Sequence, residues 1–131
     1  MVPARSTSDR ILVIAFWGQF VGDERRRTPR FPFAASVEVL EKGAGTATSA
    51  RVTELSLYGC YVEMANPLLK GVQATLRVYA ENKYFESQST VLYSQPSQGM
   101  GVGFQNVNPH YLMVLRHWLI EAAQAKFGKK D

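Results

Sequence analysis

The sequence predicts an all-β domain, an antiparallel sandwich or barrel, that ends in a single helix. After Pro32, short segments of alternating apolar and polar residues follow one another, with the period of two that half-buried strands show. Turn residues separate these segments and leave no room for helices between them, which favours antiparallel neighbours. Beyond Asn108 the apolar residues recur at helical spacing instead.

The first half of the domain contains three predicted strands. Val37 and Val39 alternate with polar neighbours, and residues 41–48 follow as a flexible turn that contains two glycines. Residues 51–56 resume a strand. The third strand presents an apolar face formed by alternate residues, namely Cys60, Val62 and Met64.

The second half of the domain contains three more strands. The fourth strand has four alternating apolar residues, Ala74, Leu76, Val78 and Ala80. Residues 81–83 are typical of a hairpin turn, and residues 84–93 form a longer strand. Residues 95–99 break that strand with proline and glycine, and residues 100–104 form the last short one.

The predicted helix has recognisable ends. Asn108 is a good N-cap, and Pro109 suits the first helical turn. Gly128 is a natural stop. The residues at helical spacing are Tyr111, Leu112, Leu115, Trp118, Leu119 and Ala122. We expect this amphipathic helix to lie on the barrel.

Length and composition indicate one folded domain in a reducing compartment. The 131 residues fall in the range of roughly 100–200 expected for one domain, which we place at residues 23–131. The single cysteine, Cys60, excludes an internal disulfide and favours a cytoplasmic protein. The net charge of +4 favours an anionic partner.

Residues 1–22 are predicted to be an N-terminal extension. Its apolar run, residues 11–17, lacks the small-residue cleavage site of a signal peptide. The run is also far shorter than the ~20 residues that a membrane-spanning helix needs, so we expect no membrane span. It is expected to pack on the domain or on a second subunit, which leaves a homodimer open.

An arginine cluster precedes the first strand. Arg25, Arg26, Arg27 and Arg30 fall within six residues. Each guanidinium fits a phosphate, or the O6/N7 edge of guanine, with two hydrogen bonds. Pro29 disfavours helix just before it, so an extended arm that wraps an anion is expected. A solvated basic loop would have the same composition.

A second polar group follows in the predicted second strand. Glu54 and Ser56 are two residues apart, so both are expected on one face of the strand. Glu54 could accept hydrogen bonds from a guanine edge, and Ser56 could donate to a phosphate. Gly59 stands where a positive φ or a close backbone approach would require glycine. A solvent-facing polar pair beside a turn is the alternative for this segment alone.

The two groups together resemble the motifs of the PilZ domain family. The pattern Arg-x-x-x-Arg is present at Arg26 and Arg30, and an acidic residue-x-Ser-x-x-Gly pattern is present at residues 54–59. Residues 101–104 are similar to the closing strand of the family, and the helix after Pro109 is similar to its C-terminal helix. The resemblance covers residues 24–123 and implies a six-stranded antiparallel barrel that binds cyclic di-GMP.

The resemblance also implies roles for individual residues. Arg26 and Arg30 would engage guanine and phosphate, Glu54 would contact a guanine edge, and Ser56 would assist it. Gly59 would keep the turn tight. The residue before the first motif arginine, here Arg25, would influence ligand stoichiometry, and its charge favours a stacked pair of ligands. The family has Asp or Asn at the position of Glu54, so the longer side chain is expected to reduce affinity.

Other chemistry finds little support in the sequence. His117 and Glu121 are four residues apart on the helix, but a third metal ligand is missing from the sequence pattern, so no metal site is expected. Cys60 alternates with core residues and is interpreted as a packed side chain. There is no set of nucleophile, base and orienting group, so we predict neither catalytic residues nor a cofactor, and no enzyme.

These observations predict a bacterial cytoplasmic receptor that changes conformation on binding cyclic di-GMP and passes the signal to a partner protein. The alternative is an interaction protein of the same fold that binds no nucleotide, which Glu54 motivates. A single-strand nucleic-acid binder is disfavoured, because no strand carries an aromatic row for base stacking.

Overall fold

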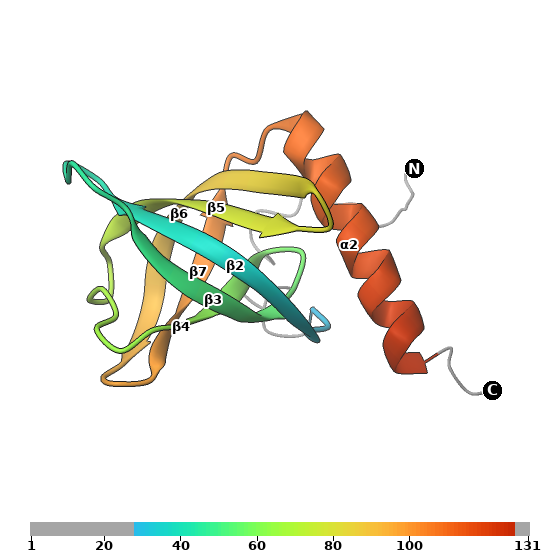
Figure 1. Ribbon diagram of the computed structural model, residues 1–131, viewed down its shortest axis with the longest axis horizontal. Coiled ribbons are helices and arrows are strands. Elements are labelled where there is room, and N and C mark those ends of the chain that lie inside the picture. The colour runs from blue at the N-terminus through green and yellow to red at the C-terminus, as the bar shows by residue number, and fades with distance from the viewer. Residues whose placement is uncertain (1–27, 128–131) are drawn as a thin grey trace, which may run out of the picture.

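The computed structural model describes residues 28–127. The elements, in chain order, are strands β2 (Phe31–Glu41), β3 (Thr48–Leu55), β4 (Gly59–Glu63), β5 (Gln73–Ala80), β6 (Lys83–Gln95) and β7 (Gly99–Gln105), then helix α2 (Pro109–Phe127). The strands close a barrel in the order β2-β3-β4-β7-β6-β5, as Figure 1 shows, and every neighbouring pair is antiparallel. The expected six-stranded antiparallel barrel with a C-terminal helix is therefore confirmed.

The barrel interior is filled by the alternate residues that the sequence pattern selects. Val37 and Val39 on β2 are 1% and 3% exposed, and Val62 on β4 and Leu76 and Val78 on β5 are fully buried. Met64 follows the end of β4 and packs against this core from its margin. The serines of β6 face inward as well, because Ser87 and Ser89 are buried and hydrogen bond to carbonyls of their own strand or of β7.

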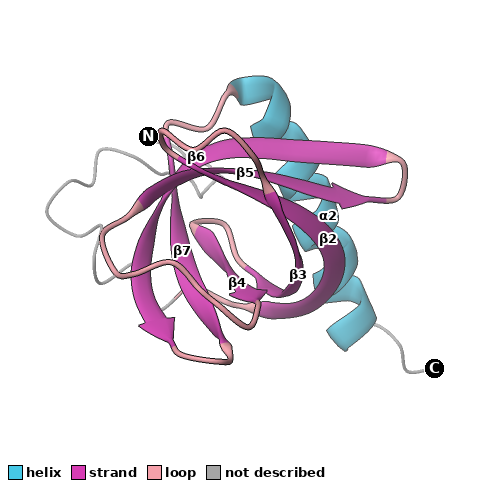
Figure 2. Ribbon diagram, turned by 60° about the vertical axis from the view of Figure 1, so that its left-hand side comes forward, coloured by secondary structure: helices cyan, strands magenta, loops and turns pink. Residues whose placement is uncertain are grey.

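Helix α2 lies against the barrel and contacts β6 and β2, as the side view in Figure 2 shows. Leu115 and Trp118 on its inner face are fully buried, and the Trp118 ring packs on Phe33 with a centroid separation of 5.3 Å. Asn108 caps the helix as predicted, since its Oδ1 accepts a hydrogen bond of 2.8 Å from the amide of His110. No helix within residues 28–127 is both long and apolar enough to cross a bilayer.

The β5–β6 turn is the predicted hairpin. Its two loop residues, Glu81 and Asn82, have φ angles of 53° and 63°, the left-handed conformation that a two-residue type I′ turn requires. The N-terminal extension, Arg25 and Arg26 lie outside the described residues. The domain boundary at residue 23 therefore stays a prediction.

Candidate functional site

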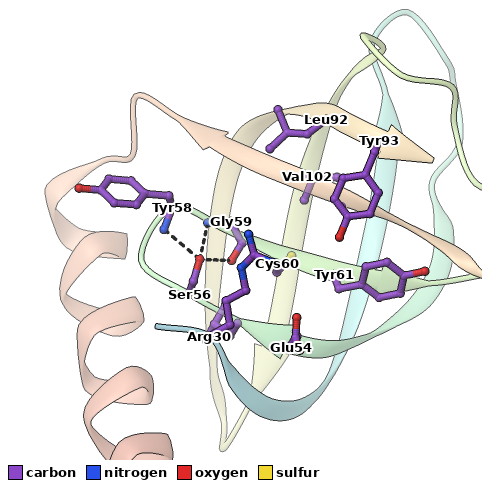
Figure 3. Close-up of a pocket in the computed structure, with 12 residues that line it drawn as sticks. Arg30, Glu54, Ser56, Tyr58, Gly59, Cys60, Tyr61, Leu92, Tyr93 and Val102 are labelled. Carbon is purple, nitrogen blue, oxygen red and sulfur yellow. Dashed lines mark hydrogen bonds between the residues drawn. The ribbon is translucent and has the colours of Figure 1, made fainter. Parts of the chain in front are cut away.

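An open hollow on the outer face of the barrel brings together the start of β2, the β3–β4 turn and the adjacent parts of β6 and β7 (Figure 3). Its lining residues are Arg30, Glu54, Leu55, Ser56, Tyr58, Gly59, Cys60, Tyr61, Leu92, Tyr93, Gly101 and Val102. The cavity measures about 60 Å³, far below the roughly 300–1,000 Å³ of clefts that enclose small molecules. A ligand larger than a few atoms would therefore lie across this hollow rather than inside it.

Four of the six predicted site residues line the hollow: Arg30, Glu54, Ser56 and Gly59. Antiparallel pairing explains the convergence of two of them, because Pro32 on β2 is the partner of Glu54 on β3 and Arg30 directly precedes β2. Both Arg30 and Glu54 are exposed, and neither forms an ion pair with another residue of 28–127. Figure 3 shows both side chains directed toward the hollow. An unpaired guanidinium in this position is available to an anion.

Ser56 differs from its predicted placement. Strand β3 ends at Leu55, so Ser56 lies in the turn and the alternation of strand faces does not apply to it. Its hydroxyl accepts hydrogen bonds from the amides of Tyr58 and Gly59, at 3.3 and 3.2 Å, and donates one of 3.2 Å to the Gly59 carbonyl. The side chain is 8% exposed. Ser56 therefore shapes the turn, and its only proton is already committed to a backbone carbonyl.

Gly59 is required by a close approach of two backbones. A Cβ atom at this position would lie 2.1 Å from the Val102 carbonyl oxygen on β7. Gly59 pairs with Gly103 of that strand. Of the two reasons that the sequence left open for glycine here, the close approach is the one that the structure shows. Any side chain would push β4 away from β7 and widen the hollow.

Aromatic residues form the part of the hollow that the sequence did not reveal. Tyr61 on β4 pairs with Glu54 on one side and with Gly101 on the other, and Gly101 pairs in turn with Tyr93 on β6. The rings of Tyr61 and Tyr93 are 6.3 Å apart between centroids. They lie 32 positions apart in the sequence, on strands that are not neighbours, so no single-strand pattern could show them together. The outward phase of Tyr61, between buried Cys60 and Val62, was the available signal.

The ionisable groups of the hollow do not favour nucleophilic chemistry. Burial raises the pKa of the Cys60 thiol to about 12, so the thiol stays protonated at neutral pH. Partial desolvation, together with nearby Tyr93 and Glu63, raises the pKa of Tyr61 above its usual range. Its phenol therefore remains a donor, and it hydrogen bonds to Oε1 of Gln95.

One feature outside the hollow corrects the sequence analysis. His117 Nε2 and Glu121 Oε2 are 3.2 Å apart on α2, as their spacing suggests. The third candidate ligand, which the sequence pattern lacked, is supplied by Glu81 of the β5–β6 turn, and the three ligand atoms lie within 4.8 Å of one another. Glu81 and His117 are exposed and Glu121 is half-buried, as is common for surface carboxylates without a metal.

The chain is similar to PilZ domains both in sequence and in structure. The family model described as PilZ domain matches residues 24–121. The PilZ domain of YcgR from Escherichia coli, solved with c-di-GMP, has a TM-score of 0.65 at 18% identity, and the match covers 81% of this chain and 99% of that one. The PilZ domain of CeSA from a cellulose-synthesizing bacterium has a TM-score of 0.59 at 16% identity, with 72% and 97% covered.

A third structure, the inhibitor of motility MotI/DgrA of Bacillus subtilis, has a TM-score of 0.62 at 17% identity, covering 81% of this chain and 53% of that one. No curated protein sequence gives a significant match. At these identities the structural likeness carries the fold, and the site must be argued from its own residues.

Proposed function

The chain belongs to the PilZ domain family, and from that premise we propose that it is a receptor domain for cyclic di-GMP and not an enzyme. The observation that carries the proposal is the convergence of Arg30, Glu54 and the Ser56–Gly59 turn on one open hollow. These groups come from separate segments, and the exposed side chains of Arg30 and Glu54 take no part in the barrel core. The c-di-GMP in the structure of the YcgR domain, which has the same fold, adds support.

The chemistry of the hollow suits a ligand with two phosphates and two guanines. The Arg30 fork can donate two hydrogen bonds to a guanine O6/N7 edge or to a phosphate. The Glu54 carboxylate can accept from the N1 and N2 donors of guanine. Ser56 and Gly59 contribute by holding the turn close to β7. In this proposal Arg25 and Arg26 supply the remaining cations from the segment before β2.

The proposed output is a change at the start of the domain. Two phosphates would neutralise the arginine segment and draw it across the hollow, beside the apolar run of residues 11–17. A partner protein in the cytoplasm would read the altered surface, and a homodimer could form there as well. The ligand can drive this change only through its higher affinity for the closed arrangement. Amide hydrogen exchange across residues 20–32 should fall at saturating cyclic di-GMP, and equal exchange would exclude this output.

A second candidate function rests on Glu54. Its carboxylate stands one methylene farther from the backbone than the Asp of the family pattern, and binding groups tolerate only about 0.5 Å of misplacement. The domain would then be a PilZ-fold interaction protein that binds no nucleotide.

Calorimetric titration of the full chain separates the two candidates. Saturable binding of cyclic di-GMP, with GMP and single-stranded DNA as controls, is expected for the receptor. Absence of heat with cyclic di-GMP, in protein shown by circular dichroism to be folded, would instead support the interaction protein.

A further inference from the structure

Strand β7 has glycine at every outward position beside the hollow. Its inward residues, Met100 and Val102, are buried in the core, whereas the outward positions are Gly99, Gly101 and Gly103. Without side chains of their own, these outward positions form a shallow track of backbone, and all three glycines are nevertheless buried. The neighbouring strands must supply whatever covers that track.

Large side chains from β4 and β6 pack over these glycines. A Cβ atom built at Gly101 would stand 2.3 Å from the ring of Tyr93, and one at Gly99 would stand 2.8 Å from the Tyr61 hydroxyl. Each ring therefore occupies the space that a β7 side chain would fill. The two rings are tilted by 33° to each other, and the hydrogen bond from Tyr61 to Gln95 fixes the first of them.

Two irregularities in strand register aim residues at the hollow. The pairing of β3 with β4 shifts between Val52 and Glu54, and that of β6 with β7 shifts between Val91 and Tyr93. In β6 the extra residue leaves Leu92 and Tyr93 both outward, at 41% and 43% exposure. Bulges of this kind redirect side chains and are common beside functional sites. Here they face each other across β4 and β7.

We propose that Tyr61 and Tyr93 form a stacking surface for one base of the cyclic dinucleotide, in the same hollow as the edge-reading groups Arg30 and Glu54. Figure 3 shows the Tyr93 ring on one side of the hollow and Arg30 and Glu54 on the other, with Tyr61 next to Glu54, its partner in the sheet. Aromatic faces bind bases of any sequence by stacking, while charged groups read an edge or a phosphate. The inference rests on the proposed function.

A purely structural role makes a different prediction. Aromatic side chains also stabilise sheets by covering glycines of the neighbouring strand. If covering Gly99 and Gly101 were their only task, replacing either ring would lower the melting temperature and leave ligand affinity unchanged. Affinity and stability must therefore be measured separately on the same variants.

The experiment compares Tyr93→Leu and Tyr61→Leu with the matched control Tyr84→Leu. Tyr84 stands on the same strand as Tyr93 with almost equal exposure, 42% against 43%, but does not line the hollow. Calorimetry should show Kd for cyclic di-GMP raised about 5- to 100-fold by either hollow variant, the range of stacking on one base. The control should keep the parent Kd, and Tyr61→Phe, which retains the ring, should stay within about 2-fold.

Unchanged Kd in both folded hollow variants, or an equal loss in Tyr84→Leu, overturns the stacking surface while the receptor function stands. A parent chain that does not bind cyclic di-GMP overturns the receptor function and this inference together. If a leucine variant fails to fold, Tyr93→Trp keeps a ring in place. Its added indole emission, relative to the parent, should be quenched at saturating cyclic di-GMP, and unquenched emission would overturn the proposal.

Discussion

Two groups of tyrosines lie on the outer surface of this barrel, and they differ in how closely their rings and hydroxyls contact one another. The group near the helix comprises Tyr79, Tyr84 and Tyr111. Tyr84 packs against both others, at centroid distances of 5.8 and 5.5 Å, and its hydroxyl lies 3.1 Å from that of Tyr111. Arg77 covers the Tyr84 ring and pairs with Glu86. These tyrosines close a network that connects β5 and β6 to α2.

The group at the hollow, Tyr61 and Tyr93, is the more open of the two. Its rings are 6.3 Å apart, a longer distance, and rest on glycine backbone. They line the same hollow as Arg30, which forms no ion pair with another residue of 28–127. The same residue type therefore serves two purposes according to what surrounds it. Tyrosines among mutual partners stabilise the fold, and in our proposal the tyrosines that cover glycine backbone beside Arg30 present a surface for a ligand.

The largest effect is expected from the helix side. Trp118→Ala should lower the free energy of unfolding by about 3–5 kcal/mol, because the ring is fully buried against Phe33. Urea unfolding measures the loss. The control is Met113→Ala on the same helix, because Met113 is 71% exposed, and it should change the free energy of unfolding by less than about 0.5 kcal/mol. Folded Trp118→Ala should keep its affinity for cyclic di-GMP. A large loss of affinity would mean that the helix side also contributes to binding, which contradicts the separation of the two groups.

The next effect is expected at the hollow. Arg30→Ala should raise Kd for cyclic di-GMP about 10- to 100-fold, the range of one charge-assisted contact, with little change in melting temperature. Arg51→Ala removes the same charge from an exposed position on β3 that does not line the hollow, so it controls for net charge. Equal losses in the two variants would mean that the ligand responds only to overall charge and that the site assignment is wrong.

A smaller effect is expected in the closed tyrosine network. A double-mutant cycle of Tyr84→Leu and Tyr111→Leu should give a coupling energy of about 0.5–1.5 kcal/mol in unfolding, because the rings and hydroxyls contact each other. The same cycle measured on binding of cyclic di-GMP should give no coupling. If these tyrosines were coupled in binding but not in unfolding, the two groups would have exchanged roles.

The sequence predicted those features that depend on local period and short motifs. Alternation located the buried valines, and the motif residues Arg30, Glu54 and Gly59 meet at one hollow. Register between strands is not encoded in the period of any one strand, and three irregularities shift it among the described strands. The row from Glu54 through Tyr61 to Tyr93 could therefore not be foreseen, nor could the arrival of Glu81 beside the helix.

The prediction with the smallest expected effect concerns Glu54, which the bulge in β3 turns outward beside Tyr61. If the extra methylene misaligns the hydrogen bond between the Glu54 carboxylate and guanine, Glu54→Asp should lower Kd for cyclic di-GMP by about 2- to 10-fold, the range of one hydrogen bond. Glu54→Ala should raise Kd. Glu63→Asp makes the same change on β4 outside the hollow and should have no effect. Weaker binding in both Glu54 variants would mean that the longer side chain fits this hollow. Unchanged affinity in both would place Glu54 outside the site and leave base recognition to Arg30 and the tyrosines.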